Sequence, residues 1–184
     1  MKFRPGQVLE KFETDGKEVV FRMPKRSDLK GCMKHINLLV KEKAYLATQK
    51  KVTLKQEREW LNGVMKEIGG KNAVNVFVTI DGKYAGNARI EKHKMDSTGH
   101  VAEIGITLSL GRGMGIGTRL MALLEKIARN HFKSRILRLD VYEGNTPAKR
   151  LYKKMGFKKI GVIPKGCKHF GRYLDYILMY KELK

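Results

Sequence analysis

Apolar residues recur at every third or fourth position in two stretches of the N-terminal half, which predicts two amphipathic helices. Ser27 or Asp28 can cap the first helix, and Thr53 caps the second, since these residue types are typical of helix N-caps. The apolar stripe of the second helix is formed by Trp60, Leu61, Val64 and Ile68. The apolar stripe of the first helix is formed by Leu29, Met33, Ile36, Leu39 and Val40.

Alternating and β-branched runs elsewhere predict strands at residues 18–24, 99–110, 134–145, 158–164 and 173–183. Residues 74–93 indicate a hairpin, whose Asp81-Gly82 turn tolerates positive φ. One more helix follows the glycine-rich segment 109–120, and a short one starts at Thr146-Pro147 and ends at Gly156. The order β-α-α-β-β-β-α-β-α-β-β predicts an α/β fold, with a mixed central sheet of about six to seven strands flanked by helices.

The chain length of 184 residues suffices for one domain with its own core, and we do not expect two domains. We expect residues 1–17 to form a loose N-terminal extension and residues 18–184 to form the domain. No stretch approaches the roughly 20 consecutive apolar residues of a membrane helix, and the first residues lack the apolar core of a signal peptide. These observations lead us to expect a soluble, cytoplasmic protein.

The net charge is strongly positive, because 39 lysines and arginines stand against 18 aspartates and glutamates, giving +21 at pH 7. A field of this sign attracts anions such as nucleotides, nucleic acids and acidic proteins, without selecting among them. The sequence contains no zinc-finger spacing and no RNA-binding signature with interleaved aromatic residues. The two cysteines, Cys32 and Cys167, are distant in sequence, so we expect two reduced thiols and no metal site.

The segment 109–120 places glycines at 111, 113, 115 and 117, directly before a helix. The Rossmann pattern G-x-G-x-x-G fails, because Thr118 occupies the place of its last glycine, and no Gly-Lys pair continues as a P-loop. What remains is Arg112 followed by alternating glycines. Small residues let backbone N–H groups surround an anion, the helix N-terminus adds partial positive charge, and Arg112 can add a charge-assisted hydrogen bond. The segment therefore predicts a phosphate-binding turn.

Three motifs in the same order resemble those of the Gcn5-related N-acetyltransferase (GNAT) family. The R-x-x-G-x-G turn that begins at Arg112 resembles the family's pyrophosphate loop for acetyl-coenzyme A. Residues 145–157, NTPAKRLYKKMGF, match the element N-x-x-A-x-x-L-Y-x-x-x-G-F, and HVAEIGITL before the turn is like the strand beside the pantetheine arm. The resemblance covers about residues 18–182. It implies a GNAT domain with splayed central strands that uses acetyl-CoA, releases CoA and transfers acetyl directly to a primary amine.

The resemblance also implies which residues bind the cofactor. Ile106, Thr107 and Leu108 would align the pantetheine arm, and a backbone N–H in this strand, that of Leu108, would polarise the carbonyl. Asn145 would hydrogen-bond the cofactor arm, although an asparagine here is also a simple helix cap. The pyrophosphate would be held by Arg112 and by the turn residues Gly113, Met114, Gly115, Ile116, Gly117 and Thr118.

Tyr152 and Glu103 are the candidate catalytic acid and base. The reference pKa of the Tyr152 phenol, near 10, is higher than that of a thiol, near 8.5. The phenol can therefore donate a proton to the departing thiolate and contact the cofactor. The alternative is a tyrosine that only packs. Glu103 is a carboxylate in an otherwise apolar strand, which suggests a base acting directly or through water, or else an ion-paired structural charge. His100 is the alternative base.

The acceptor is the least determined part of the sequence. The ending KHFGRYLDYILMYK resembles the y-x-D-x-x-x-M ending of enzymes that acetylate amino acids, polyamines or related amines. This makes Tyr173 and Asp175 candidate contacts for an acceptor ammonium. The alternative is that both are simply surface residues of a strand. We expect a small primary amine. The alternatives are a protein N-terminus or lysine, and a non-enzymatic, basic nucleic-acid-binding module on the same fold. We expect no membrane partner and a monomer or homodimer.

Overall fold

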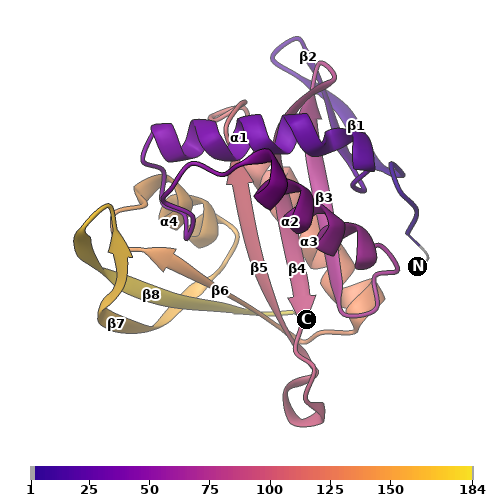
Figure 1. Cartoon of the computed structure of the whole chain (residues 1–184). Coiled ribbons are helices and arrows are strands. Elements are labelled where there is room, and N and C mark those ends of the chain that lie inside the picture. Colours follow the sequence, from indigo (N-terminus) through magenta and orange to yellow (C-terminus); the bar gives the residue numbers. More distant parts are fainter. Residues whose placement is uncertain (1–2, 184) are drawn as a thin grey trace.

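The computed structural model describes residues 3–183 and confirms a mixed α/β fold (Figure 1). Short 3₁₀ turns occur at Arg26–Asp28 and Asp96–Thr98, and a π-helical turn at Ala128–Phe132 continues α3. The strands and helices are, in chain order, β1 Val8–Thr14, β2 Lys17–Arg22, α1 Leu29–Lys41, α2 Leu54–Lys66, β3 Ala73–Ile80, β4 Lys83–Lys92, β5 Val101–Leu108, α3 Ile116–Ile127, β6 Ile136–Tyr142, α4 Thr146–Lys154, β7 Lys158–His169 and β8 Arg172–Glu182.

One eight-stranded sheet runs in the order β1-β2-β3-β4-β5-β6-β8-β7. All neighbours pair antiparallel except β5 and β6, which pair parallel over Val101–Glu103 of β5 and Ile136–Arg138 of β6. Residues 104–108 of β5 continue beside β4 but have no partner on β6. The central strands therefore separate, as the resemblance implied, and leave one edge of β5 open toward its C-terminal end (Figure 1).

The N-terminal residues are not the loose extension that the sequence led us to expect. Residues 8–14 form β1, which pairs antiparallel with β2 through a turn at Asp15-Gly16. Both turn residues have positive φ, 50° and 68°, as do Asp81-Gly82 in the predicted hairpin of β3 and β4. Phe12 packs edge-on against Phe21 at 5.3 Å between ring centroids. The sheet consequently has eight strands, where we expected six to seven.

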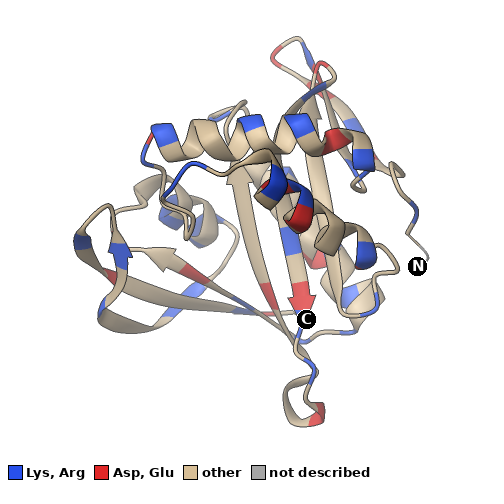
Figure 2. Cartoon of the chain, viewed as in Figure 1, with Lys and Arg blue, Asp and Glu red and all other residues tan. Residues whose placement is uncertain are grey.

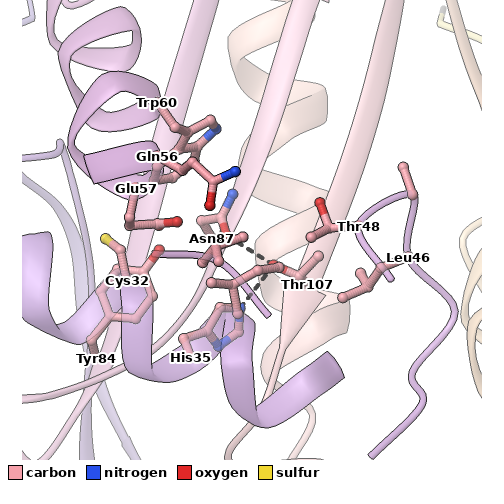
Figure 3. A pocket seen from close by; sticks show the side chains of 13 residues that line it. Cys32, His35, Leu46, Thr48, Gln56, Glu57, Trp60, Tyr84, Asn87 and Thr107 are labelled. Atoms are coloured by element: carbon pink, nitrogen blue, oxygen red, sulfur yellow. Dashed lines mark hydrogen bonds between the residues drawn. The ribbon is translucent and has the colours of Figure 1, made fainter. Parts of the chain in front are cut away.

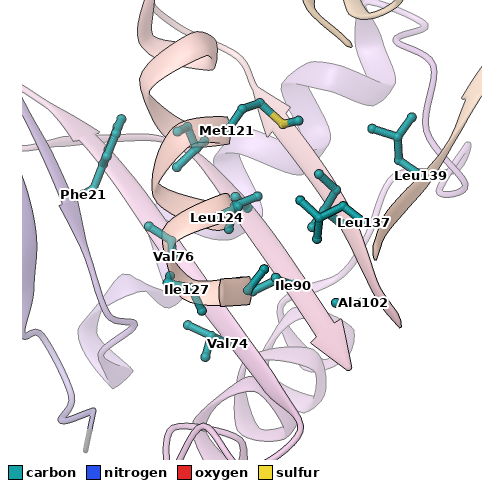
Figure 4. Close-up of a cluster of buried hydrophobic side chains, with 14 of the residues drawn as sticks. Phe21, Val74, Val76, Ile90, Ala102, Met121, Leu124, Ile127, Leu137 and Leu139 are labelled. Atoms are coloured by element: carbon teal, nitrogen blue, oxygen red, sulfur yellow. The ribbon is translucent and has the colours of Figure 1, made fainter. Parts of the chain in front are cut away.

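The main apolar core lies between the sheet and α3 (Figure 4). Met121 and Leu124 of α3 are fully buried against strand residues such as Val76, Ile90 and Leu137. α4 contributes Tyr152 to the same core. This packing fixes the start of α3, and with it the glycine turn, at the end of β5.

The helices α1 and α2 cover the opposite face of the sheet and have a second, smaller cluster, formed by Cys32, Leu61, Val64 and Phe77 (Figure 1). The fully buried residues of α1 are Cys32, His35 and Leu39. Of the expected stripe, Leu39 is fully buried and Leu29 packs against the smaller cluster, while Met33, Ile36 and Val40 are half-buried. The side chain of Thr53 caps α2 as predicted, accepting a hydrogen bond from the Gln56 N–H at 3.3 Å. Trp60, expected on the buried stripe, is 40% exposed.

The excess of basic residues is spread over the helices and the β7–β8 hairpin and does not form a tail (Figure 2). Within residues 3–183, no helix is long and apolar enough to cross a membrane.

Candidate active site

The glycine turn between β5 and α3 leaves backbone donors free. Gly113 and Gly115 have φ of 87° and 75°, a left-handed conformation that favours glycine, and a Cβ at either would meet only open space. The N–H groups of Gly113, Gly115, Ile116 and Gly117 donate no hydrogen bond within residues 3–183. Free N–H groups at the N-terminus of a 12-residue helix form an arrangement that suits an anion.

Arg112 lies between the end of α1 and the end of β5. Its Nη2 is 2.6 Å from a carboxylate oxygen of Glu42, and its Nε donates to the carbonyl of Leu108 at 3.3 Å. The side chain is 56% exposed. A guanidinium has five N–H donors, so these contacts hold Arg112 beside the turn and leave donors for a phosphate.

A pocket of about 310 Å³, called the turn pocket below, lies between the end of α1, the following loop, β5 and the start of α4. Five of the residues predicted to bind the cofactor line it, namely Ile106, Thr107, Leu108, Arg112 and Asn145, whereas Tyr152 does not. Met114, Thr118 and the glycines between them are not among its lining residues. The other lining residues are Leu39, Glu42, Lys43, Ala44, Tyr45, Leu46 and Pro147.

A second pocket of about 290 Å³, called the helix pocket below, lies under α1 and α2 (Figure 3). It shares Leu46 and Thr107 with the turn pocket, so the two pockets meet at β5. The other lining residues are Cys32, His35, Ile36, Ala47, Thr48, Val52, Gln56, Glu57, Trp60, Tyr84 and Asn87. Two pockets that meet at one strand can hold two reactants side by side.

His35 of α1 holds Thr107 at this junction (Figure 3). Its Nε2 lies 3.1 Å from the Thr107 hydroxyl and its Nδ1 lies 2.7 Å from the Ser109 hydroxyl. The Thr107 hydroxyl in turn donates to Asn87 Oδ1 at 2.8 Å. Burial, helped by the positive charge of Arg112, lowers the pKa of His35 to about 4. The imidazole is therefore neutral at pH 7, with one ring nitrogen donating and the other accepting.

Tyr152 and Asn145 lie at the two ends of α4. Asn145 caps the helix, accepting from the N–H of Ala148 at 3.3 Å, and it also lines the turn pocket, so both expected roles are compatible. Tyr152 is 6% exposed, with its ring 6.1 Å from that of Phe157. Burial, and to a smaller degree Tyr176, raises the pKa of Tyr152 to about 12, which keeps the phenol protonated.

Glu103 lies on β5 where β5 and β6 still pair. Its carboxylate is 3.5 Å from Nε of Arg138, and its side chain is 49% exposed. Glu103 lines neither the turn pocket nor the helix pocket. His100 precedes β5 and lies further from the junction, beside Arg135 and Leu183.

Tyr173 and Asp175, the expected acceptor contacts on β8, also lie outside both pockets. Tyr173 is 63% exposed, with the Lys168 ammonium 5.6 Å from its ring centroid. Asp175 accepts a hydrogen bond from the backbone N–H of Lys165 at 2.9 Å, which ties the β7 and β8 strands together.

Both cysteines are free thiols. Burial raises the pKa of Cys32 in the helix pocket to about 12, so this thiol stays protonated. No group of three or more His, Cys, Asp or Glu side chains in the described part of the chain could hold a metal ion.

Sequence reasoning did not single out His35 and Glu57 as site residues. A usable signal existed for both, because His35 shares a helix face with Cys32 and Leu39, and Glu57 lies one turn before Leu61 on the buried stripe of α2. A titratable side chain on the apolar face of a helix points into the core or into a pocket.

The lowered pKa of His35 predicts a pH-dependent stability. Between pH 4 and pH 6.5 the unfolded histidine binds a proton that the folded one does not, so the free energy of unfolding rises with pH across this window by up to about 3 kcal/mol. Urea denaturation at pH 4.5 and pH 7 should show a smaller stability difference in His35→Gln than in the wild type. An unchanged difference would show that folding does not lower the pKa of His35.

Comparison with known proteins places this geometry in a family. The acetyltransferase (GNAT) family model matches residues 37–157, more than half of the chain. The chain is 31% identical over 101 residues to the L-amino acid N-acetyltransferase AaaT of Escherichia coli, covering 54% of this chain and 62% of the relative. The match thus spans less than two thirds of that relative's length.

Solved structures agree in fold. The ribosomal-protein-alanine N-acetyltransferase of Brucella melitensis is 25% identical with a TM-score of 0.76, covering 89% of this chain and 99% of that chain. The structure of yncA from Salmonella typhimurium with its cofactor acetyl-CoA is 20% identical with a TM-score of 0.75, covering 90% and 94%. The family match, together with the splayed strands and the turn of free amides, shows that this chain belongs to the acetyltransferase (GNAT) family.

Proposed function

We propose that this protein is an N-acetyltransferase that moves an acetyl group from acetyl-CoA directly to a primary amine of a small molecule such as an amino acid. The observation that carries the proposal is the meeting of two pockets at Thr107, one of them beside a turn of unpaired amides. The turn pocket takes the acetyl donor, and the helix pocket takes the acceptor. The relative in Escherichia coli, an L-amino acid N-acetyltransferase, supports this acceptor class.

The residues present fit the donor. The free amides of Gly113, Gly115, Ile116 and Gly117, with Arg112 beside them, suit a pyrophosphate, and the open edge of β5 offers backbone groups to the pantetheine arm. Acetyl-CoA supplies an activated thioester to this site. The backbone N–H of Leu108 polarises its carbonyl oxygen.

In the transfer step, the acceptor nitrogen forms a bond to the acetyl carbon, and the bond between that carbon and sulfur breaks. Glu103 removes the proton that the amine loses. It acts through water, because it lies outside both pockets. His100 is the alternative base. Tyr152 gives its proton to the thiolate that leaves. Burial keeps this phenol protonated at pH 7, although it lines neither the turn pocket nor the helix pocket.

A second candidate acceptor is the N-terminal amine of a protein. The similarity to the ribosomal-protein-alanine N-acetyltransferase of Brucella melitensis favours this acceptor, since the two structures match over most of both chains. Binding of nucleic acid remains a third candidate on the basis of the net charge alone, and it would weaken steeply with added salt.

The direct test is release of the CoA thiol from acetyl-CoA in the presence of amino acids, polyamines and peptides with free N-termini. We expect release with small amines. Release only with peptides would establish the second candidate, and no release with any amine would contradict an acetyltransferase.

Replacing Tyr152 by Phe should lower turnover about tenfold or more, because the departing thiolate loses its proton donor. Binding of acetyl-CoA, measured by calorimetry, should change little, since only the phenol oxygen is removed. Full turnover in the Tyr152→Phe variant would remove the role of acid from this residue.

Replacing Arg112 by Ala should weaken acetyl-CoA binding in calorimetry about tenfold, the size expected for a charged hydrogen bond. Arg129→Ala is the matched control, because it removes the same charge beyond the far end of α3. Equal affinities for the two variants would show that Arg112 does not contact the pyrophosphate.

A further inference from the structure

We propose that the helix pocket binds a second, positively charged group of the acceptor, and that Glu57 is the carboxylate that binds it. The substrate is then a small molecule that carries a cation in addition to the amine that is acetylated. This inference rests on the proposed acetyl transfer, because the junction at Thr107 decides which end of the acceptor reacts.

Glu57 is a buried carboxylate without a partner. It is 7% exposed and lies on the stripe of α2 that packs against the sheet. Its side chain makes no hydrogen bond or ion pair within residues 3–183, and its oxygens point into the helix pocket (Figure 3). An unpaired buried carboxylate is costly to the fold, and an opposite charge in the pocket would relieve that cost.

The other titratable side chains that line the pocket are neutral near pH 7. Burial raises the pKa of Cys32 to about 12 and that of Tyr84 well above its usual value, and it lowers the pKa of His35 to about 4. Burial also raises the pKa of Glu57, and a bound cation would favour its ionised form. Glu57 therefore decides the sign of the charge that the pocket accepts.

Aromatic and amide groups complete a site for a cation. Trp60 lies at the pocket with its ring parallel to that of Phe77 and 40% of its surface exposed, which leaves it available to a cation. The side-chain amides of Gln56 and Asn87 face the same space as the Glu57 carboxylate (Figure 3). A volume of about 290 Å³ suits a small molecule.

The net charge of +21 repels a cation at long range, but salt screens this repulsion over about 8 Å. Inside the pocket, the carboxylate of Glu57 is the nearest charge and is screened much less. The charge of the whole protein therefore does not exclude a cationic acceptor.

The experiment compares two pairs of acceptors that differ by one charge: L-lysine with L-norleucine, and 1,5-diaminopentane with pentylamine. Initial rates of CoA release give kcat and KM for each. The wild type should favour the charged member of each pair, and Glu57→Gln should raise KM for that member about tenfold with kcat unchanged. The values for the neutral member should stay within about twofold.

Two variants separate charge recognition from folding. Glu57→Asp keeps the charge and should retain the preference for the charged acceptors, and Glu59→Gln, on the exposed face of the same helix, should behave as the wild type. Equal loss with charged and neutral acceptors in Glu57→Gln would overturn the inference, as would a wild type without preference.

Calorimetry keeps this inference separate from the proposed acetyl transfer. L-lysine and L-norleucine are titrated into the protein with CoA bound, for the wild type and for Glu57→Gln. If the wild type binds lysine more tightly than norleucine and Glu57→Gln abolishes this difference, the result supports a cation site even if no amine is acetylated. Equal binding of the two ligands by the wild type contradicts it.

Discussion

The separation of β5 from β6 is the constraint on which both pockets depend. These two strands form the one parallel pair among the described strands, and they pair over only three residues of each. Each strand keeps a long antiparallel partner on its outer side, β4 for β5 and β8 for β6, so the sheet remains hydrogen-bonded while its inner edges part. The glycine turn follows the end of β5 and α4 follows the end of β6, which brings both to the mouth of the gap.

The pockets on either side of Thr107 are lined by different charged side chains. The turn pocket has Arg112, its ion-pair partner Glu42, and Lys43, while the helix pocket contains one carboxylate, that of Glu57. The two pockets therefore differ in the charges that face them. The neutral His35 lies between them and fixes the Thr107 hydroxyl without adding a charge that would disturb either side.

Part of the turn pocket could be predicted from the sequence because its signals are local. Arg112 and Asn145 stand in contiguous motifs, at a turn and at a helix cap, and both line the turn pocket. The helix pocket could not, since the placement of His35 and Glu57 in its lining depends on how α1 and α2 rotate against the sheet. The missed strand β1 has another cause: its turn, Asp15-Gly16, has the same type of sequence as the hairpin turn that was predicted, but the run before it is polar enough to suggest a loop.

Two separate apolar clusters stabilise the two sides of the sheet. The large one fixes α3 and the glycine turn, whereas Cys32, Leu61, Val64 and Phe77 fix α1 and α2. Leu61 and Val64 of α2 belong to the smaller cluster alone, whereas Met65 packs against both clusters. A substitution at Leu61 or Val64 should therefore loosen the packing of α1 and α2 first and leave in place the core that holds α3 and the glycine turn.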